Sequence, residues 1–171
     1  MKNAMRSNRL STICSYVPKA DTIADIGADH GKVSAYIYRN SFAKNLIVND
    51  ISADSLQKAK KLFDTLKPNG TAAQFILSDG ADLKSLISIP IDCIIIAGLG
   101  GREITKIITA LMPPIAILDP RKNIPELRQS LLELDYQFIA DTHIQDKGRF
   151  YDIMCVERRI CSLTKKTIIQ H

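Results

Sequence analysis

Residues 21–31 read Asp-Thr-Ile-Ala-Asp-Ile-Gly-Ala-Asp-His-Gly. The apolar run at 22–26 is typical of a buried strand, and it breaks into a turn in which Gly27 and Gly31 flank Asp29. In open α/β folds, a strand followed by a glycine-containing turn and a helix holds a nucleotide-like ligand. This stretch therefore predicts an α/β fold with a ligand-binding loop after its first strand.

Strand-like and helix-like patterns alternate five times along the chain, after a basic amphipathic helix at 6–17. The alternation predicts a mostly parallel sheet with right-handed crossovers. The expected strands are 22–26, 45–49, 73–77, 91–97 and 115–118, and the expected helices are 32–39, 53–66, 83–87, 103–111 and 125–134. Two last strands, 136–143 and 149–157, are close enough to pair as an antiparallel hairpin. We expect one domain over residues 1–157 and a short basic tail over 158–171.

Composition limits the class of protein. The chain has 171 residues, 46% of them hydrophobic and 24% charged, as in a single globular domain. It has neither an apolar run of 18 residues nor a signal-peptide pattern, so no membrane partner is expected. The four cysteines form no Cys-x-x-Cys pair and the three histidines complete no ligand pattern. We therefore expect a cytoplasmic protein with reduced cysteines and no metal site.

The net charge of +5 is concentrated at the two ends. Residues 1–20 carry four basic and no acidic side chains, and so do residues 158–171. This distribution suits either a basic surface that binds phosphate groups, such as those of RNA, or ordinary solvated chain ends.

Six of the eight glycines follow the expected first, third and fourth strands: Gly27, Gly31, Gly80, Gly98, Gly100 and Gly101. The carboxyl ends of parallel strands meet at one edge of a sheet, and ligands bind there. Glycine at such positions lets the backbone approach a ligand closely. The glycines therefore predict a binding site at that edge.

Two carboxylates belong to the same edge. Asp50 closes the second strand, 23 residues after Gly27, where an acidic residue commonly takes the ribose hydroxyls of an adenosine ligand. Asp79 and Gly80 close the third strand, where an acceptor and a backbone N–H suit an adenine edge. The alternatives are that Asp50 caps the next helix and that Asp79 forms an Asx-turn.

The turn after the first strand discriminates between adenosine ligands. A dinucleotide needs a bare backbone at the helix N-terminus, and the carboxylate of Asp29 would repel pyrophosphate. A carboxylate is compatible with the sulfonium and amino-acid part of S-adenosyl-L-methionine. The chain has no phosphate-binding loop of the Gly-x-x-x-x-Gly-Lys-Ser/Thr type. The pattern therefore favours a methyl-donor cofactor.

Four motifs together carry a family resemblance: residues 24–31 (Ala-Asp-Ile-Gly-Ala-Asp-His-Gly), 78–80 (Ser-Asp-Gly), 96–101 (Ile-Ala-Gly-Leu-Gly-Gly) and 146–151 (Asp-Lys-Gly-Arg-Phe-Tyr). In this order they resemble the TrmK family of bacterial tRNA (adenine-N1)-methyltransferases, which modify position 22 of tRNA. The resemblance implies a class I, Rossmann-like methyltransferase fold over roughly residues 8–157. It implies these cofactor-binding residues: Asp25, Gly27, Asp29, Asp50, Ile51, Asp79, Gly80, Ala97 and Gly98. It places the loop of Gly98, Gly100 and Gly101 beside the methyl group and target base.

The chain departs from the family at two places. Family members usually continue into a C-terminal helical domain that helps to hold tRNA, whereas this chain ends about 14 residues after its last expected strand. Where the family typically has Gln-Pro-Asn, this chain has Asp119-Pro120-Arg121-Lys122-Asn123. Our hypothesis is that Arg121 and Lys122 contact RNA in place of the missing region.

Asp29 and His30 are the candidate catalytic residues. Methylation of adenine N1 builds positive charge on the ring, which a fixed carboxylate stabilises, and Asp29 would also accept a proton from N6. The alternatives are that Asp29 only contacts the cofactor and that His30 only caps or packs. Tyr36 and Tyr151 either stack on a base or pack within the domain.

We therefore expect an enzyme that methylates adenine N1 in tRNA with S-adenosyl-L-methionine. Two alternatives remain: a cofactor-binding module without catalysis, and a methyltransferase of a small molecule or protein. The expected partner is tRNA, and the sequence does not predict the oligomeric state.

Overall fold

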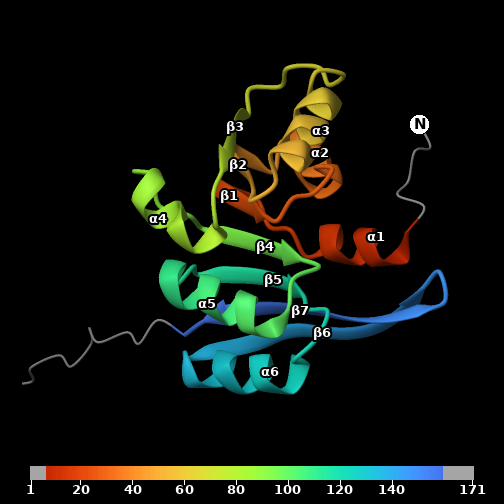
Figure 1. The fold of residues 1–171 in the computed structure, drawn as a ribbon, viewed down its shortest axis with the longest axis vertical. Helices are drawn as coiled ribbons and strands as arrows, with labels where there is room; N and C mark the ends of the chain where they lie inside the picture. The colour runs from red at the N-terminus through yellow and green to blue at the C-terminus, as the bar shows by residue number, and fades with distance from the viewer. Residues whose placement is uncertain (1–6, 160–171) are drawn as a thin grey trace, which may run out of the picture.

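A computed structural model describes residues 7–159. Seven strands form one sheet in the order β3-β2-β1-β4-β5-β7-β6 (Figure 1). The strands are β1 (Ala20–Ile26), β2 (Ala43–Asp50), β3 (Ala72–Leu77), β4 (Cys93–Ala97), β5 (Ile115–Asp119), β6 (Tyr136–Asp146) and β7 (Arg149–Arg158). The helices are α1 (Asn8–Ser15), α2 (Lys32–Arg39), α3 (Ala53–Phe63), α4 (Leu83–Leu86), α5 (Gly101–Leu111) and α6 (Ile124–Glu133), with a 3₁₀ turn, η1 (Gly80–Asp82), before α4. The predicted α/β class is confirmed.

The first five strands are parallel, and β7 inserts antiparallel between β5 and β6. Lys147 and Gly148 join the last two strands, with φ angles of 49° and 77°. Two positive φ values in a two-residue loop match the twist of a tight hairpin. The predicted hairpin is confirmed, and β6 runs three residues further than expected. Figure 1 shows the hairpin extending past the ends of the parallel strands.

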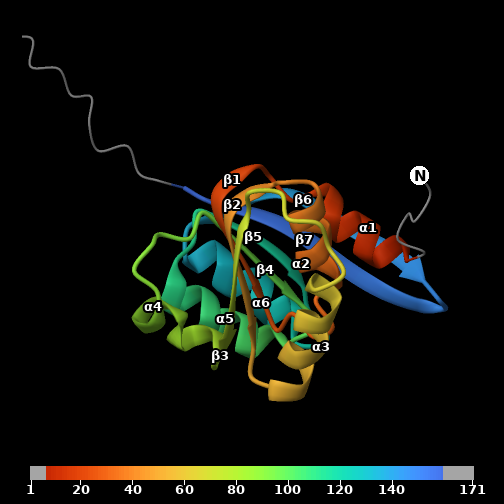
Figure 2. The same ribbon diagram turned by 90° about the horizontal axis from the view of Figure 1, so that it is seen from above.

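Helices cover both faces of the sheet (Figure 2). One apolar core joins α1, α2 and α3 to the sheet, and the other joins α4, α5 and α6 to the opposite face. The central strand β4 contributes to both cores, because its first four side chains are fully buried. This agrees with its continuous apolar sequence, which is typical of a strand covered on both faces.

Several boundaries differ from the expected ones by a few residues. Helix α5 begins at Gly101 rather than 103, and α3 ends at Phe63 rather than 66. Arg158, expected in the tail, is the last residue of β7, and its guanidinium donates to the carbonyl of Met112 at 3.1 Å. Residues 1–6 and 160–171, which hold much of the two basic ends, lie outside the described residues. No helix within residues 7–159 is long and apolar enough to cross a membrane.

Candidate active site

The loop between β1 and α2 is built from left-handed residues. Gly27, Asp29 and Gly31 have φ angles of 69°, 50° and 69°. The amide of Ala28 donates to the carbonyl of Asn49, and the amide of Asp29 donates to Asp50 Oδ2, both at 2.9 Å. The loop is therefore tied to the end of the neighbouring strand β2.

The last glycine of this loop serves packing. A Cβ on Gly31 would lie 2.8 Å from the Cβ of Ala59 on α3. Real Cβ atoms do not approach so closely, so glycine lets α2 begin against α3. By contrast, a Cβ on Gly27 would meet only Leu99 side-chain atoms, at 3.7 Å or more.

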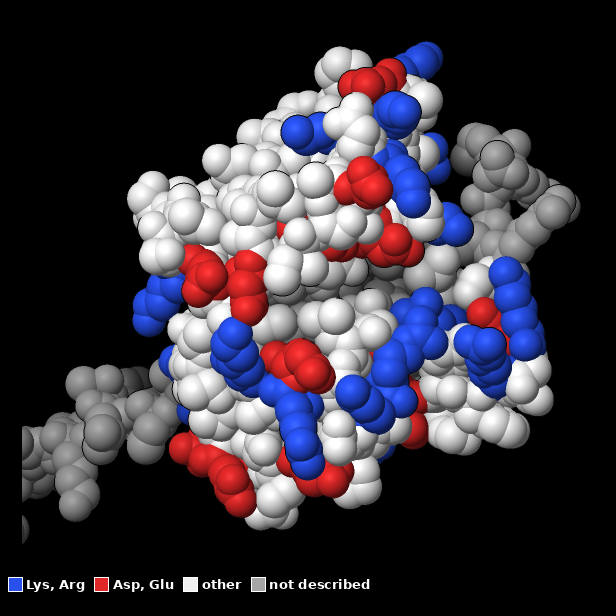
Figure 3. Space-filling view, in the orientation of Figure 1, with Lys and Arg blue, Asp and Glu red and all other residues white. Residues whose placement is uncertain are grey.

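A cavity of about 470 Å³ lies at the carboxyl ends of β1, β2 and β4; we call it the edge cavity. It contains eight of the nine predicted cofactor residues, Gly27, Asp29, Asp50, Ile51, Asp79, Gly80, Ala97 and Gly98, together with Arg121. Sequence reasoning missed the rest of its lining: Ile26, Asn49, Ser78, Leu99, Glu103, Lys106 and Ile107. Figure 3 shows this face hollowed, with Asp and Glu side chains above the hollow and Lys and Arg side chains at its lower right.

Asp50 organises one end of the edge cavity. Its Oδ2 accepts from the Asp29 amide and its Oδ1 accepts from the Ser52 amide at 2.8 Å. The N-cap of α3 is Ser52, whose hydroxyl accepts from the Ser55 amide, so Asp50 does not cap that helix. A carboxylate has further lone pairs, so Asp50 can still accept from ligand hydroxyls.

Ile51 is the most exposed large apolar residue of the described chain, at 77%. It lines the edge cavity directly after Asp50. An apolar side chain exposed in a concave site is available to cover the face of an aromatic ligand.

Asp79 forms the Asx-turn considered for it and also lines the edge cavity. Its Oδ1 accepts from the Ala81 amide at 3.0 Å, which is the Asx-turn, and its Oδ2 pairs with Lys106 Nζ at 2.7 Å. The hydrogen bond from Lys106 lowers the pKa of this carboxyl below its usual value. The carboxylate lines the edge cavity at the same time. Gly80 beside it is buried, and a Cβ there would lie 2.3 Å from Ile26 Cγ2.

A smaller hollow of about 160 Å³ adjoins the edge cavity; we call it the Asp29 hollow. Asp29 lines both spaces, and its side chain is 71% exposed. His30 Nδ1 lies 2.8 Å from Asp29 Oδ2. The two candidate catalytic residues are therefore paired, and the carboxylate is open to a ligand in either space.

Asp25 lies deeper than the other predicted site residues. It is 3% exposed, and its Oδ2 accepts from the amide and hydroxyl of Ser34 at 3.1 and 2.5 Å. Burial raises the pKa of Asp25 to about 6. Its visible role is to hold the first turn of α2 beneath the loop.

We expect Asp25→Asn to change how stability depends on pH. Because the folded-state pKa of Asp25 lies above its ordinary value of 3.8, this group favours folding below pH 4 and loses that contribution as pH rises through 6. Urea unfolding of both proteins from pH 4 to pH 8 measures the effect. The wild type should lose on the order of 2–3 kcal/mol relative to Asp25→Asn. If the free energies of unfolding of the two proteins differed by the same amount from pH 4 to pH 8, the raised pKa of Asp25 would be contradicted.

The glycines after β4 divide into two groups. Gly98 has a φ of 102°, and a Cβ there would face Arg121 Nε at 3.5 Å. A Cβ on Gly100 would lie 2.8 Å from Lys122 Cε, and one on Gly101 would lie 2.4 Å from the carbonyl oxygen of Asn123. Gly98 lines the edge cavity, whereas Gly100 packs against the side chains of Glu103 and Lys122, and Gly101 packs against the backbone of the loop between β5 and α6.

Arg121 and Lys122 were both predicted to contact RNA, but only Arg121 lines the cavities at this edge of the sheet. It lines both the edge cavity and the Asp29 hollow, whereas Lys122 is in the lining of neither.

An ion pair that the sequence did not suggest joins α1 to this edge. Arg9 Nε donates to Asp119 Oδ2 at 2.5 Å, and the Asp119 side chain is fully buried. Burial raises the pKa of Asp119, and the Arg9 charge opposes that shift. The guanidinium carbons of Arg9 and Arg121 lie 5.2 and 5.5 Å from the ring centre of Tyr151 on β7. This cluster joins α1, the β5–α6 loop and the hairpin beside the Asp29 hollow.

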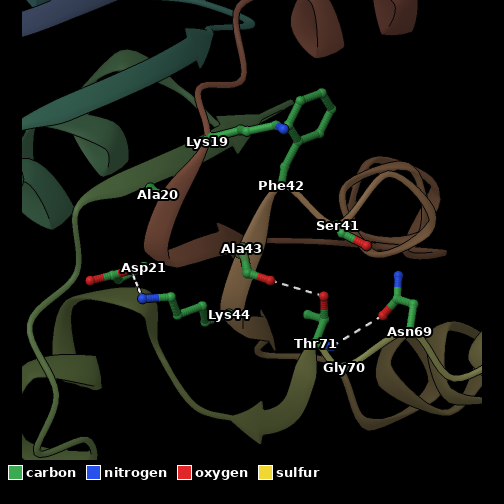
Figure 4. A pocket seen from close by; sticks show the side chains of 10 residues that line it. All are labelled: Lys19, Ala20, Asp21, Ser41, Phe42, Ala43, Lys44, Asn69, Gly70 and Thr71. Atoms are coloured by element: carbon green, nitrogen blue, oxygen red, sulfur yellow. Dashed lines mark hydrogen bonds and ion pairs between the residues drawn. The ribbon is translucent and has the colours of Figure 1, made fainter.

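A separate cavity of about 440 Å³ lies at the opposite edge of the sheet, where β1 and β2 begin (Figure 4). Two pairs of its polar groups bind one another: Lys44 pairs with Asp21 at 2.8 Å, and the Thr71 hydroxyl donates to the carbonyl of Ala43 at 2.9 Å. None of the predicted site residues lies there. No group of three or more potential metal ligands is present in the described part of the chain.

Comparison with known proteins agrees with this architecture. The family model described as a methyltransferase domain matches residues 6–154. A Mycoplasma pneumoniae protein named "Putative tRNA methyltransferase" is 32% identical over 154 residues, covering 88% of this chain and 70% of that protein. The tRNA (adenine(22)-N(1))-methyltransferase of Bacillus subtilis is 26% identical over 162 residues, covering 92% of this chain and 67% of its own length.

The fold is also similar to that of a solved methyltransferase structure. TrmK of M. capricolum, in complex with S-adenosyl-homocysteine, superposes with a TM-score of 0.81 at 25% identity, covering 91% of this chain and 70% of that one. Residues 6–154, which the family model matches, include the loops that form the edge cavity. With the family match over most of its length, the chain belongs to the methyltransferase domain family and, within it, to the TrmK family.

Proposed function

We propose that this chain methylates N1 of adenine 22 in tRNA and uses S-adenosyl-L-methionine as the methyl donor. The observation that carries the proposal is the edge cavity, which is lined by Asp50 and Ile51 after β2, by Asp29 in the adjoining β1–α2 loop and by the bare backbone of Gly98. The printed names of the TrmK relatives support the choice of substrate.

The residues at the edge cavity fit an adenosine cofactor. The Asp50 carboxylate suits ribose hydroxyls, and exposed Ile51 offers an apolar surface to the adenine face. Asp79 and Gly80 supply an acceptor and a backbone N–H for the adenine edge. The Asp29 hollow, bordered by Arg9 and the amides of the β1–α2 loop, suits the charged amino-acid end. When bound, S-adenosyl-L-methionine supplies an electrophilic methyl group on a positively charged sulfur.

The catalytic work of the chain itself is positioning and charge stabilisation. Adenine N1 has an in-plane lone pair, so it attacks without prior deprotonation. Positive charge then develops on the ring, and the Asp29 carboxylate would stabilise that charge and accept from N6. His30, 2.8 Å away, would hold the Asp29 side chain in place. The target base must leave its stack to reach this point, so alignment of N1 with the methyl group supplies much of the rate.

Ile51→Ala should weaken cofactor binding by roughly tenfold, because it removes about 1–2 kcal/mol of apolar contact with the adenine ring. Isothermal titration with S-adenosylhomocysteine measures the affinity. Ile139→Ala is the matched control, since Ile139 is also exposed, at 57%, but lies on β6. Equal affinities for the two variants would show that Ile51 does not cover the ligand.

The proposed function is tested by incubating the full chain with methyl-labelled S-adenosylmethionine and unmodified tRNA. Label in 1-methyladenosine supports the proposal. Cofactor binding without transfer would indicate a binding module, and transfer only to proteins or small molecules would indicate another substrate. A tRNA substrate would also place the enzyme in the cytoplasm, which suits the buried, unpaired thiols of Cys14, Cys93 and Cys155.

A further inference from the structure

A groove of about 440 Å³ lies between α1, α2 and the tip of the β6–β7 hairpin; we call it the α1–α2 groove. Its lining includes four cationic side chains: Arg9, Lys32, Arg39 and Lys147. Figure 3 shows Lys and Arg side chains on the side of the molecule where α1 and the hairpin tip lie. The groove is therefore a concave, basic surface.

Most of this positive charge is available to a ligand. Lys32, Arg39 and Lys147 are exposed, and none of them pairs with a carboxylate within residues 7–159. Lys32 and Arg39 lie seven residues apart on α2, which places them on the same face about 10 Å apart along the helix axis. Such spacing suits successive anionic groups of an extended partner.

The single carboxylate that lines the groove is already engaged. Asp146 is 9% exposed, its Oδ2 accepts from the Ser7 hydroxyl at 2.6 Å, and its Oδ1 accepts from the Asn8 amide at 3.2 Å. These bonds join the N-terminus of α1 to the hairpin tip. Asp146 therefore fixes the groove wall, and its charge is directed at α1 rather than at the exposed lysines.

The groove leads into the active site. Arg9, Leu10 and Lys32 line both the α1–α2 groove and the Asp29 hollow. The Asp29 hollow in turn shares Gly27, Asp29, Ala97 and Arg121 with the edge cavity. A polyanion lying in the groove would therefore run directly to the point at which Asp29 is exposed.

We infer that the α1–α2 groove binds the phosphate backbone of the RNA strand that carries the target adenine. This inference rests on the proposed function, because the groove opens onto the site that would receive the flipped base. RNA suits the groove better than an acidic membrane surface, because the cations lie in a concavity rather than on a flat face. Arg39 and Lys147 are the best probes, since they line the groove but neither the edge cavity nor the Asp29 hollow.

The test compares the wild type with the double variant Arg39→Gln/Lys147→Gln. Fluorescence anisotropy with labelled, unmodified tRNA and saturating S-adenosylhomocysteine gives the affinity from 50 to 300 mM KCl. The control is Lys44→Gln/Lys84→Gln, which has the same net charge but changes cations at the opposite edge of the sheet. Thermal unfolding and cofactor titration check that the wild type, the double variant and the control are folded. If the double variant does not fold, the single variants Arg39→Gln and Lys147→Gln are used in its place.

We expect the double variant to bind tRNA at least tenfold more weakly near physiological salt. The slope of the logarithm of the tRNA association constant against the logarithm of the KCl concentration should decrease in magnitude by about 1.4–1.8, the value for two lost phosphate contacts. The Lys44→Gln/Lys84→Gln control should stay within twofold of wild type. Wild-type affinity and slope in the double variant would overturn the inference, as would a wild type that does not bind tRNA. Anionic vesicle binding through Arg39 and Lys147 without tRNA binding would also overturn it.

Methyl transfer, measured on the same samples, separates this inference from the proposed function. If the wild type methylates tRNA and the double variant does so at unchanged KM, the function stands and the groove assignment fails. If the groove binds tRNA but no methyl group is transferred, the groove assignment stands and the proposed function fails.

Discussion

Asp29→Asn is expected to lower the rate of methyl transfer to tRNA by about 100-fold or more, because it removes the carboxylate that we propose stabilises the developing positive charge. Asparagine tolerates the left-handed backbone that this position requires, with a φ of 50°, so the loop should keep its shape. Cofactor affinity should remain measurable. Single-turnover assays with saturating cofactor and tRNA give the rate, and titration with S-adenosylhomocysteine gives the affinity.

Asp135→Asn is the matched control for this substitution. Asp135 is also exposed and left-handed, with a φ of 62°, but it lies before β6 rather than at the carboxyl edge. The control should retain wild-type rates. If Asp29→Asn also turns over within a few-fold of wild type, Asp29 contacts ligand without a catalytic role.

Asp50→Ala is expected to weaken cofactor binding by roughly 10- to 100-fold, which is the value of a hydrogen bond to a charged acceptor. The same change leaves the amides of Asp29 and Ser52 without their carboxylate partner, so the β1–α2 loop should also loosen. Calorimetric titration with S-adenosylmethionine measures the loss.

Asp54→Ala is the control for Asp50. Asp54 is an exposed acidic residue in the first turn of α3, four residues away, and it is not in the lining of the edge cavity. Its replacement should leave the cofactor affinity unchanged. An Asp50→Ala protein that binds like the Asp54→Ala control would remove the ribose contact from our description of the site.

The sequence predicted the order of strands and helices well because each has a clear local pattern. The run at β4 is apolar throughout, and the hairpin has a glycine in a two-residue turn. The loops that line the edge cavity could be predicted equally well, because glycines and carboxylates at strand ends are local signals. All nine predicted cofactor residues lie at the carboxyl edge, although Asp25 is buried beneath its loop.

Long-range contacts were not readable from the sequence. The Arg9–Asp119 pair joins residues 110 positions apart, and nothing local to either residue indicates the other. The α1–α2 groove depends in the same way on where the hairpin tip meets α1. The different surroundings of Gly98 and of its neighbours Gly100 and Gly101 also depend on a long-range contact, because the β5–α6 loop is about 20 residues away in the sequence. One readable signal was overlooked: Glu103, Lys106 and Ile107 recur at helical spacing on the face of α5 that borders the edge cavity.

The position of the transferred methyl group tests the central proposal most directly. The full chain is incubated with S-adenosylmethionine and either an unmodified tRNA with adenine at position 22 or the same tRNA with guanine there. Nucleoside analysis and primer extension then locate the modification. We predict 1-methyladenosine at position 22 of the first tRNA and no methylation of the second. Equal methylation of both tRNAs, or none of either by a protein that binds the cofactor, would contradict the proposed function.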